Sequence, residues 1–313
     1  MGTFMVAEPL FFEKKWGGKR LASIFPKAPK NTGEAWMFSG IPGKETTLVD
    51  CYGSESLPSA SISRLTGKRF PRIPFLVKLI NASQWLSVQV HPGDSMSSTQ
   101  EGEPWGKNEL WYVLEAGKEA KILYGLKDCP DRGQLQSILA DKKLKEHVKS
   151  VSISKGNLVD IPAGTVHALG PDSMILEIQQ ASDVTYRLFD WDREQPDRPL
   201  HTEKALDAIE FGRETSSPIQ LQRQFKNPLF DISLHDGRKT RVRGFSLVFS
   251  LETILLEGYE MKPLFCALVP FNTSVELSGA CMIIRLGKAW NSLQEKKNES
   301  HASGQKNNNQ NTE

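Results

Sequence analysis

The feature that most limits the fold is a succession of short apolar segments between residues 86 and 191. These segments are rich in β-branched and aromatic residues. Gly, Pro, Asn or Asp bounds most of them, as is typical of strands separated by turns. Many short strands predict a double-sheet sandwich or a barrel, because a parallel α/β sheet would carry helices between its strands. The predicted strands cover residues 86–90, 110–114, 120–126, 157–161, 174–179 and 185–191.

Other segments suggest how the rest of the chain is organised. Residues 131–149 are predicted to be helical, because apolar side chains recur there at helical spacing among charged residues. A second β segment runs over about residues 231–286, and it is expected to be structural because no histidine lies between Asp236 and Lys288. The last residues are too polar to bury enough surface to offset ordering, which predicts a disordered tail. We therefore expect domains at residues 1–230 and 231–288 and a tail at 289–313.

Composition and charge argue against several classes of function. The 313 residues carry a net charge of +2, so no global field favours nucleic acid, and the basic run at 237–244 is predicted to be a solvated strand or loop. No apolar run suits a membrane span, and the first residues lack the order of a signal peptide, so a cytoplasmic protein is expected. Four scattered cysteines predict neither a disulfide framework nor a thiolate zinc site: Cys51, Cys129, Cys266 and Cys281.

Two short motifs carry candidate metal ligands. In LSVQVHP, alternate side chains of a strand share a face, so Gln89 and His91 are predicted to point together, opposite to Leu86, Val88 and Val90. In KNELWYVL, a carboxylate at the front of an apolar strand, Glu109, has little structural reason to be there. Taken alone, His91 and Glu109 each have a structural explanation. A histidine after a strand is usually a hydrogen-bonded polar group, and a glutamate is often a solvated strand end.

A third motif supplies a second imidazole. Residues 156–167 follow the pattern GxxxxxPxGxxH, in which a Pro-Ala-Gly turn reverses the chain and His167 enters the next strand. This pattern is typical of cupins, which are double-sheet jelly rolls with a metal between the sheets. Two imidazoles, a carboxylate and an amide oxygen favour Zn²⁺, with Fe²⁺, Mn²⁺ or Co²⁺ as competitors. The expected fold is all-β dominated: two cupin-type jelly-roll sandwiches with a short helical insertion and some N-terminal irregular structure, the second sandwich lacking metal ligands.

These motifs, in this order, resemble the short bacterial type I mannose-6-phosphate isomerases. The likeness covers about residues 8–200 and includes Trp16-Gly-Gly18 and Gly33-Glu-Ala-Trp36 near the N-terminus. It implies that the metal ligands are Gln89, His91, Glu109 and His167. It also implies active-site roles for Lys107, Glu177, Asp183 and Arg187. Two positions depart from the family pattern: Gly93, where Asp is frequent, and Asn108, where Thr or Pro is common.

The resemblance implies a reaction that moves a proton between C1 and C2 of a sugar phosphate through an enediol(ate). Arg187 suits a phosphate or an enediolate, Lys107 adds a second positive charge, and Glu177 and Asp183 are candidate bases whose individual steps the sequence leaves open. Two alternatives remain: a cupin sugar-binding regulator without catalysis, and a cupin Fe²⁺ dioxygenase, whose usual HxH pair is replaced here by Gln89-Val-His91. The expected partner is a small sugar phosphate; monomer and dimer are equally open.

Overall fold

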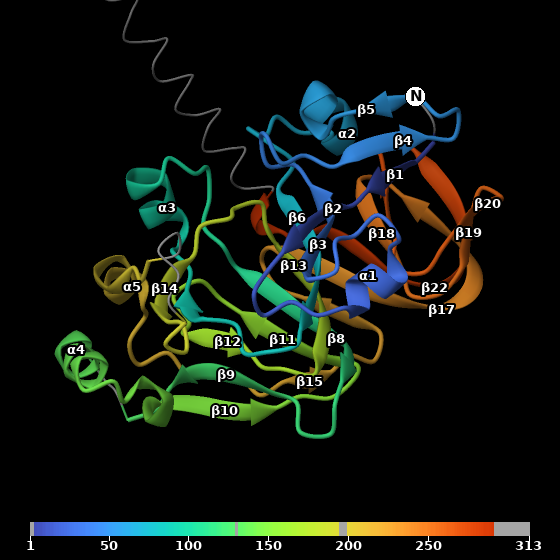
Figure 1. Ribbon diagram of the computed structural model, residues 1–313. Helices are drawn as coiled ribbons and strands as arrows, with labels where there is room; N and C mark the ends of the chain where they lie inside the picture. Colours follow the sequence, from blue (N-terminus) through green and yellow to red (C-terminus); the bar gives the residue numbers. More distant parts are fainter. Residues whose placement is uncertain (1–2, 129–130, 194–198, 291–313) are drawn as a thin grey trace, which may run out of the picture. The chain divides into compact units, whose positions relative to one another are not determined.

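Strands dominate the computed structural model, which describes residues 3–128, 131–193 and 199–290 (Figure 1). The chain divides into two compact units. Among the described residues, those within 9–46 and 74–221 form the larger unit, and those within 3–8, 47–73 and 222–290 form the smaller unit. The division differs from the predicted boundary at residue 230, because β1 (Met5–Glu8) pairs both with β4 (Thr47–Asp50) and with β21 (Cys266–Val269).

The larger unit is a sandwich of two antiparallel sheets. Its core joins residues of both sheets, such as Trp111 and Ile175 from one and Ile122 and Leu169 from the other. The seven-stranded sheet has the order β15 (Ile219–Gln220), β11 (Asn157–Ile161), β8 (Glu109–Ala116), β13 (Ser173–Gln180), β6 (Phe75–Ala82), β3 (Thr32–Ser39) and β2 (Leu10–Glu13). The five-stranded sheet has the order β10 (Val148–Ser152), β9 (Lys121–Leu126), β12 (His167–Leu169), β7 (Val88–Val90) and β14 (Tyr186–Phe189).

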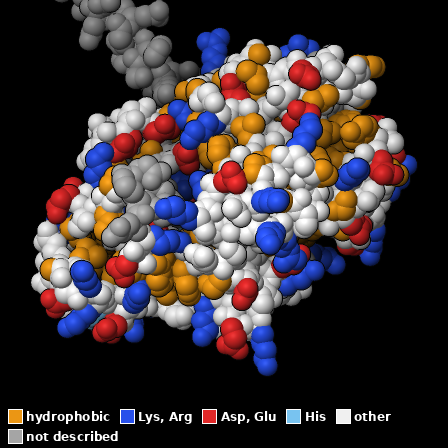
Figure 2. All heavy atoms as spheres, in the orientation of Figure 1, with side chains coloured by type: hydrophobic (Ala, Val, Ile, Leu, Met, Phe, Trp, Pro, Cys, Tyr) orange, Lys and Arg blue, Asp and Glu red, His pale blue; other side chains and the backbone are white. Residues whose placement is uncertain are grey.

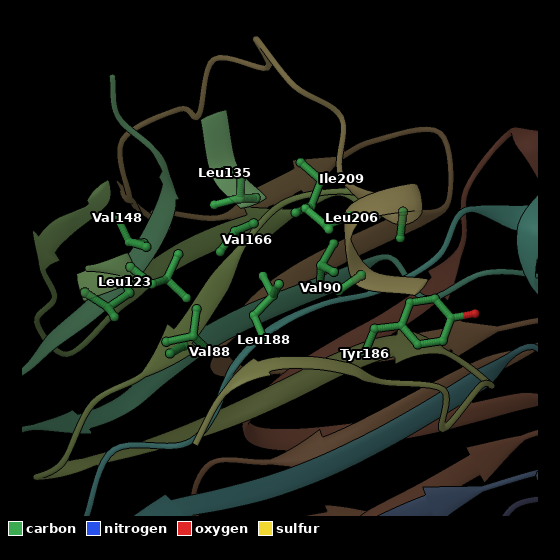
Figure 3. Packing of buried hydrophobic residues seen from close by; sticks show 14 of the residues in the cluster. Val88, Val90, Leu123, Leu135, Val148, Val166, Tyr186, Leu188, Leu206 and Ile209 are labelled. Carbon is green, nitrogen blue, oxygen red and sulfur yellow. The ribbon is translucent and has the colours of Figure 1, made fainter. Parts of the chain in front are cut away.

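A second apolar cluster covers the other face of the five-stranded sheet. It contains Val88 and Val90 of β7 together with Leu135 from α4 (Arg132–Ala140) and Leu206 from α5 (Thr202–Ala208) (Figure 3). The predicted helical segment at 131–149 is confirmed for α4, which Asp131 caps, and for the 3₁₀ turn η2 (Leu144–His147). It is wrong from Val148, which begins β10.

Strand β7 has the predicted alternation with one exception. Val88 and Val90 point to the helical side, so Gln89 and His91 face the interior between the sheets. Leu86 was expected beside the two valines, but it precedes the strand and belongs to the sandwich core instead. The reason is that the alternation holds only within the extended backbone, which begins at Val88.

The N-terminal part of the larger unit is more regular than expected. Its strands β2, β3 and β6 complete the seven-stranded sheet, and all eight residues of β6 are buried. Two short helices complete the unit's elements: α1 (Arg20–Ile24) and α3 (Asp94–Gln100).

The smaller unit is built on one hydrogen-bonded sheet, in which the two longest strands, β17 (Phe230–Arg243) and β22 (Ser274–Leu286), pair with each other. Trp290 is fully buried in this unit and donates its indole N–H to Leu229 O, so the predicted tail does not begin at residue 289. The rest of that tail, from residue 291, lies outside the described residues. The other elements are β5 (Glu55–Ser56), η1 (Pro58–Ser61), α2 (Ile62–Thr66), β16 (Gln224–Lys226), β18 (Ser246–Ser250), β19 (Ile254–Leu256) and β20 (Tyr259–Met261).

Acidic and basic side chains are interspersed over the face seen in Figure 2, in keeping with the small net charge. The basic run at 237–244 lies mostly in β17, where Arg238 pairs with Asp236 and Lys239 with Glu276, as expected for a solvated strand. Among the described residues, no helix is long and apolar enough to cross a membrane. Cys51, Cys266 and Cys281 are free thiols, and Cys129 lies outside the described residues.

Candidate active site

Three strands bring His91, Glu109 and His167 together between the sheets of the larger unit. Glu109 is the first residue of β8, His167 is the first residue of β12, and His91 directly follows β7. One ligand atom of each residue lies within 4.8 Å of those of the other two, and all three residues are buried. The Nε2 atoms of His91 and His167 lie 3.2 and 3.6 Å from the two carboxylate oxygens of Glu109.

The hydrogen bonds behind the imidazoles show that this cluster fits a cation. His91 Nδ1 lies 3.0 Å from Val184 O, and His167 Nδ1 lies 2.9 Å from Thr165 O. Since a carbonyl oxygen only accepts, both Nδ1 atoms carry the proton, and both Nε2 atoms present lone pairs to the carboxylate. Neither Glu109 oxygen accepts a hydrogen bond of normal geometry. Converging lone pairs that are oriented from behind by backbone carbonyls are typical of a metal-binding site.

The ionisation of these groups agrees with ligation. Burial, together with the positive charge of Lys107, lowers the pKa of His91 to about 3, although Glu109 opposes the shift, and burial also lowers the pKa of His167. Burial alone would raise the pKa of Glu109, but Lys107 and His91 outweigh it and hold that pKa well below its usual range. Neutral imidazoles and an ionised carboxylate are the forms that bind a metal.

Gln89 lies beside this cluster on the same face of β7. Its amide nitrogen is 3.3 Å from His167 Nε2, while its Oε1 accepts a hydrogen bond of 3.3 Å from Ser87 Oγ. A half-turn of the amide would direct Oε1 toward the cluster, as the predicted ligand role requires. The structure therefore brings all four predicted ligands together, with the amide of Gln89 in the other orientation.

A cavity of about 240 Å³ opens beside the cluster and is lined mainly by charged and polar side chains. Five predicted site residues line it: Gln89, Lys107, Glu177, Asp183 and Arg187. Lys107 Nζ lies 2.8 Å from Glu109 Oε1 and 3.4 Å from His91 Nε2, so it joins the cavity to the cluster. Such a lining suits a small, polar and charged ligand, because ordinary ligand pockets are larger and mostly apolar.

The two carboxylates of the cavity have opposite surroundings. Burial raises the pKa of Glu177, and the negative charge of Glu109 raises it further, although Lys78 opposes both. Burial would also raise the pKa of Asp183, but Lys78, Lys44 and Lys107 together hold it below its ordinary value. Lys44 Nζ pairs with Asp183 Oδ2 at 2.8 Å. Two carboxylates whose pKa values are shifted in opposite directions suit different roles in proton transfer.

A row of side chains across the seven-stranded sheet fixes Glu177. In the strand register, Lys78 of β6 lies opposite Glu177 of β13 and opposite Trp36 of β3, while Trp111 of β8 flanks Glu177 on its other side. Lys78 Nζ is 3.2 Å from Glu177 Oε1, and Trp111 Nε1 donates to Glu177 Oε2 at 2.9 Å. Trp111 also meets the ring of His167 edge-on, with 5.4 Å between ring centroids.

Three charged residues of the cavity escaped the sequence analysis: Lys14, Glu34 and Lys78. Lys14 Nζ lies 3.1 Å from Glu34 Oε1, and Lys78 Nζ lies 3.9 Å from Glu34 Oε2. Burial opposes the ionisation of Glu34, yet Lys78 and Lys14 lower its pKa to about 2. One signal was present: Lys78 stands in the middle of the apolar run FLVKLINA, where a lysine needs a buried partner.

Arg187 is almost fully buried at the cavity wall, in β14 opposite Gln89 of β7. Its Nε donates to Ser87 Oγ at 3.3 Å, and its NH1 group donates to Pro199 O at 3.0 Å. Ser87 therefore bridges Arg187 and the amide of Gln89. These bonds hold the guanidinium in one orientation against the cavity.

Comparison with known proteins decides the family. The model for the phosphomannose isomerase type I catalytic domain matches residues 7–116. The mannose-6-phosphate isomerase ManA of Bacillus subtilis is 35% identical over 222 residues, which are 66% of this chain and 69% of that protein. The mannose-6-phosphate isomerase of Streptococcus mutans is 36% identical over 222 residues, with 66% and 70% covered. The chain belongs to the type I phosphomannose isomerase family.

Solved structures of phosphomannose isomerases share the fold over nearly the whole chain. The mannose 6-phosphate isomerase of Bacillus subtilis superposes with a TM-score of 0.80 at 24% identity, covering 90% of this chain and 98% of that one. A putative mannosephosphate isomerase from Archaeoglobus fulgidus gives a TM-score of 0.77 at 19% identity, with 92% and 99% covered. A zinc-bound mannose 6-phosphate isomerase gives a TM-score of 0.73 at 16% identity, covering 91% of this chain and 100% of that one. The likeness confirms the expected all-β, cupin-type fold.

Proposed function

We propose that this phosphomannose isomerase family member is a metal-dependent aldose–ketose isomerase that interconverts mannose 6-phosphate and fructose 6-phosphate. The observation that carries the proposal is a buried His/Glu/His cluster directly beside a charged cavity. Relatives that are 35% and 36% identical bear the name mannose-6-phosphate isomerase, which supports the choice of substrate. Because a sugar phosphate is charged and does not cross membranes freely, the proposed place of action is the cytoplasm.

The charges of the cavity support a sugar phosphate as its ligand. Four cationic side chains line it, Lys14, Lys78, Lys107 and Arg187, and they outnumber its three carboxylates, Glu34, Glu177 and Asp183. A phosphate dianion is attracted by this excess, while the carboxylates and amides offer acceptors and donors to sugar hydroxyls. Arg187 is the proposed contact for the phosphate or for the developing enediolate, because its planar fork is held by Ser87 and Pro199.

In the proposed reaction, the residues of the chain move one proton between C1 and C2. Glu177 is the proposed base, because its raised pKa brings it closer to the working pH than an ordinary carboxylate. Trp111 and Lys78 orient its two oxygens. Asp183 stays ionised and is proposed to assist ring opening at a hydroxyl group. Lys107 places a positive charge where negative charge develops on the substrate oxygens.

The proposed metal ligands are His91, Glu109, His167 and, after a half-turn of its amide, Gln89. Two imidazoles with a carboxylate and an amide oxygen favour Zn²⁺, ahead of Mn²⁺, Fe²⁺ and Co²⁺. When bound, such an ion would orient and polarise the sugar oxygens without any redox change.

The direct test is a coupled assay with mannose 6-phosphate on purified protein before and after chelation. We expect chelation to abolish formation of fructose 6-phosphate and Zn²⁺, Mn²⁺ or Co²⁺ to restore it. Full activity in protein shown to be metal-free would contradict the metal role. Absence of isomerisation by zinc-loaded protein would contradict the proposed function and favour a sugar-binding regulator.

Histidine substitutions test the ligand set. His91→Ala and His167→Ala should each lose bound zinc together with activity, because each removes a ligand from the cluster. His147→Ala is the matched control, since this histidine lies in η2 outside the cluster. Metal content is measured by elemental analysis. Equal loss of zinc in all three variants would mean that a folding defect, rather than ligation, explains the result.

A further inference from the structure

A cluster of amide hydrogen bonds lies at the entrance to β8, on the reverse face of the seven-stranded sheet. Asn108 and Gln180 continue the β8–β13 register by one residue beyond the Glu109–Gln179 pair. Their side chains therefore point away from the face that carries Glu109. Gln180 Oε1 accepts hydrogen bonds from the backbone N–H of Asn108 at 3.0 Å and from its Nδ2 at 2.6 Å. Gln180 itself is fully buried.

The same amide group of Asn108 holds the turn that precedes His167. Its Oδ1 accepts the backbone N–H of Ala163 at 3.0 Å. The next residue, Gly164, donates its N–H to the carbonyl oxygen of His91 at 2.9 Å. The turn is thus fixed to the β8 entrance on one side and to the backbone of a candidate ligand on the other.

A third branch reaches the loop that follows His91. Gln180 Nε2 donates to Asp94 Oδ1 at 3.2 Å, and Asp94 Oδ1 also accepts the backbone N–H of Gly106 at 2.7 Å. This carboxylate links the residues after His91 to the residues before Lys107. The three chain segments that bear His91, Glu109 and His167 are therefore connected through Asn108 and its partner Gln180.

We propose that Asn108 is a positioning residue for the metal centre, which locks the three ligand-bearing segments into one rigid arrangement without touching the ion. The inference rests on the proposed function, since it assumes that the cluster binds a metal. A site that is held in its bound geometry loses less conformational freedom when the ion enters, so groups behind the ligands contribute to affinity.

The side-chain chemistry explains why an amide serves here. Asn108 uses an acceptor for Ala163 and a donor for Gln180 at the same time. A threonine would have one short oxygen for both tasks, and a proline would have neither a side-chain donor nor the backbone N–H. The amide of Asn108 therefore allows both contacts to form at once.

The test compares the Zn²⁺ dissociation constant of Asn108→Ala with that of the wild-type full chain, by competition with a chromophoric chelator. We expect binding to be weaker by about 10-fold or more, the usual effect of losing a group behind the ligands. Asn157→Ala is the matched control, because Asn157 also donates Nδ2 to a glutamine oxygen, of Gln220, and accepts a backbone N–H, from Ser154. Its zinc affinity should equal that of the wild type.

A second variant, Gln180→Met, keeps the buried volume and leaves Asn108 in place without its partner. This variant should also weaken zinc binding, and it replaces Asn108→Ala in the test if Asn108→Ala does not fold. The thermal midpoint of each metal-free variant is measured to show that the variant is folded. A dissociation constant within twofold of wild type in the folded variants, or an equal loss in Asn157→Ala, overturns the inference. Failure of the wild type to bind zinc would instead contradict the metal centre of the proposed function.

Discussion

At the residue scale, the pKa of each charged side chain in the candidate site is set by its neighbours. Glu177 and Asp183 are both carboxylates of one cavity, yet burial and Glu109 raise the pKa of the first, while three lysines lower that of the second. Lys78 stays charged in the sheet because Glu177 and Glu34 flank it. The roles proposed for these groups therefore follow from their neighbours and not from residue type.

Arg187→Lys separates a catalytic role from a scaffold role. Lysine keeps the charge but loses the planar fork that Ser87 and Pro199 orient. We expect kcat to fall by roughly 10²–10³-fold, by analogy with the loss of one donor to a developing oxyanion, with KM little changed. Zinc content should stay the same. Steady-state kinetics check this: a higher KM at normal kcat would assign Arg187 to ground-state phosphate binding, and normal values of both would remove it from the site.

Trp111→Phe tests how Glu177 is held. The indole N–H stabilises the ionised carboxylate, so its removal should raise the pKa of Glu177 further. A base must be ionised to act, so the acidic limb of the plot of kcat/KM against pH should move to higher pH. We expect a shift of about one pH unit, because the free energy of a hydrogen bond to a charged group corresponds to about one pKa unit. Trp290→Phe is the control, because it also loses a buried indole hydrogen bond, to Leu229 O in the smaller unit. An unmoved acidic limb in Trp111→Phe would remove Glu177 as the titrating base.

At the element scale, the site forms where β7 ends and where β8 and β12 begin. The period of two in β7 and the turn before β12 were readable in the sequence, because each lies within a few consecutive residues. Strand β11 was predicted with its observed bounds for the same reason, since its apolar run is local. The residues predicted as ligands lie together. The charges of β3 and β6 were not predicted, since Lys78 acquires its role only from Glu34 and Glu177 on neighbouring strands.

Gly164→Ala tests the turn before His167. Gly164 has φ +87°, and an added Cβ would lie 2.9 Å from Glu210 Cγ and 3.2 Å from Ala208 O. The left-handed backbone alone costs an alanine about 1–2 kcal/mol. Gly43→Ala is the matched control, because Gly43 has φ +76° with nothing within 4 Å of the added atom. The thermal midpoint should fall further in Gly164→Ala, and only this variant should bind Zn²⁺ more weakly, because Gly164 N–H holds His91 O. Equal effects in both variants would contradict the role of the turn.

At the scale of the whole molecule, each unit draws on separate stretches of the chain. Residues 3–8 and 47–73 join the C-terminal strands in the smaller unit, and residues 9–46 join the larger one. A boundary read along the sequence could not show this, because β1 and β21 are more than 250 residues apart and their pairing leaves no local pattern. The fold class was readable because it depends on strand lengths and turns, which are local.

The restriction of all candidate ligands to the larger unit predicts where zinc stabilises the protein. At a free Zn²⁺ concentration of 100 times the dissociation constant, binding adds about 2.7 kcal/mol to the stability of the folded form that binds it. Amides of β8 and β12 that exchange through opening of the larger unit should then exchange about 100-fold more slowly, whereas β18 and β21 should be unchanged. Hydrogen-exchange mass spectrometry measures the amide exchange rates in both units. Equal slowing in both units would show that they open together.

The ammonium group of Lys107 joins the two halves of the candidate site. Its Nζ lies 2.8 Å from Glu109 Oε1 and 3.4 Å from His91 Nε2, and the same side chain lines the cavity. One positive charge therefore faces the proposed metal ligands and the proposed substrate at once. A zinc ion and a phosphate dianion would meet the same ammonium group, which repels the first and attracts the second.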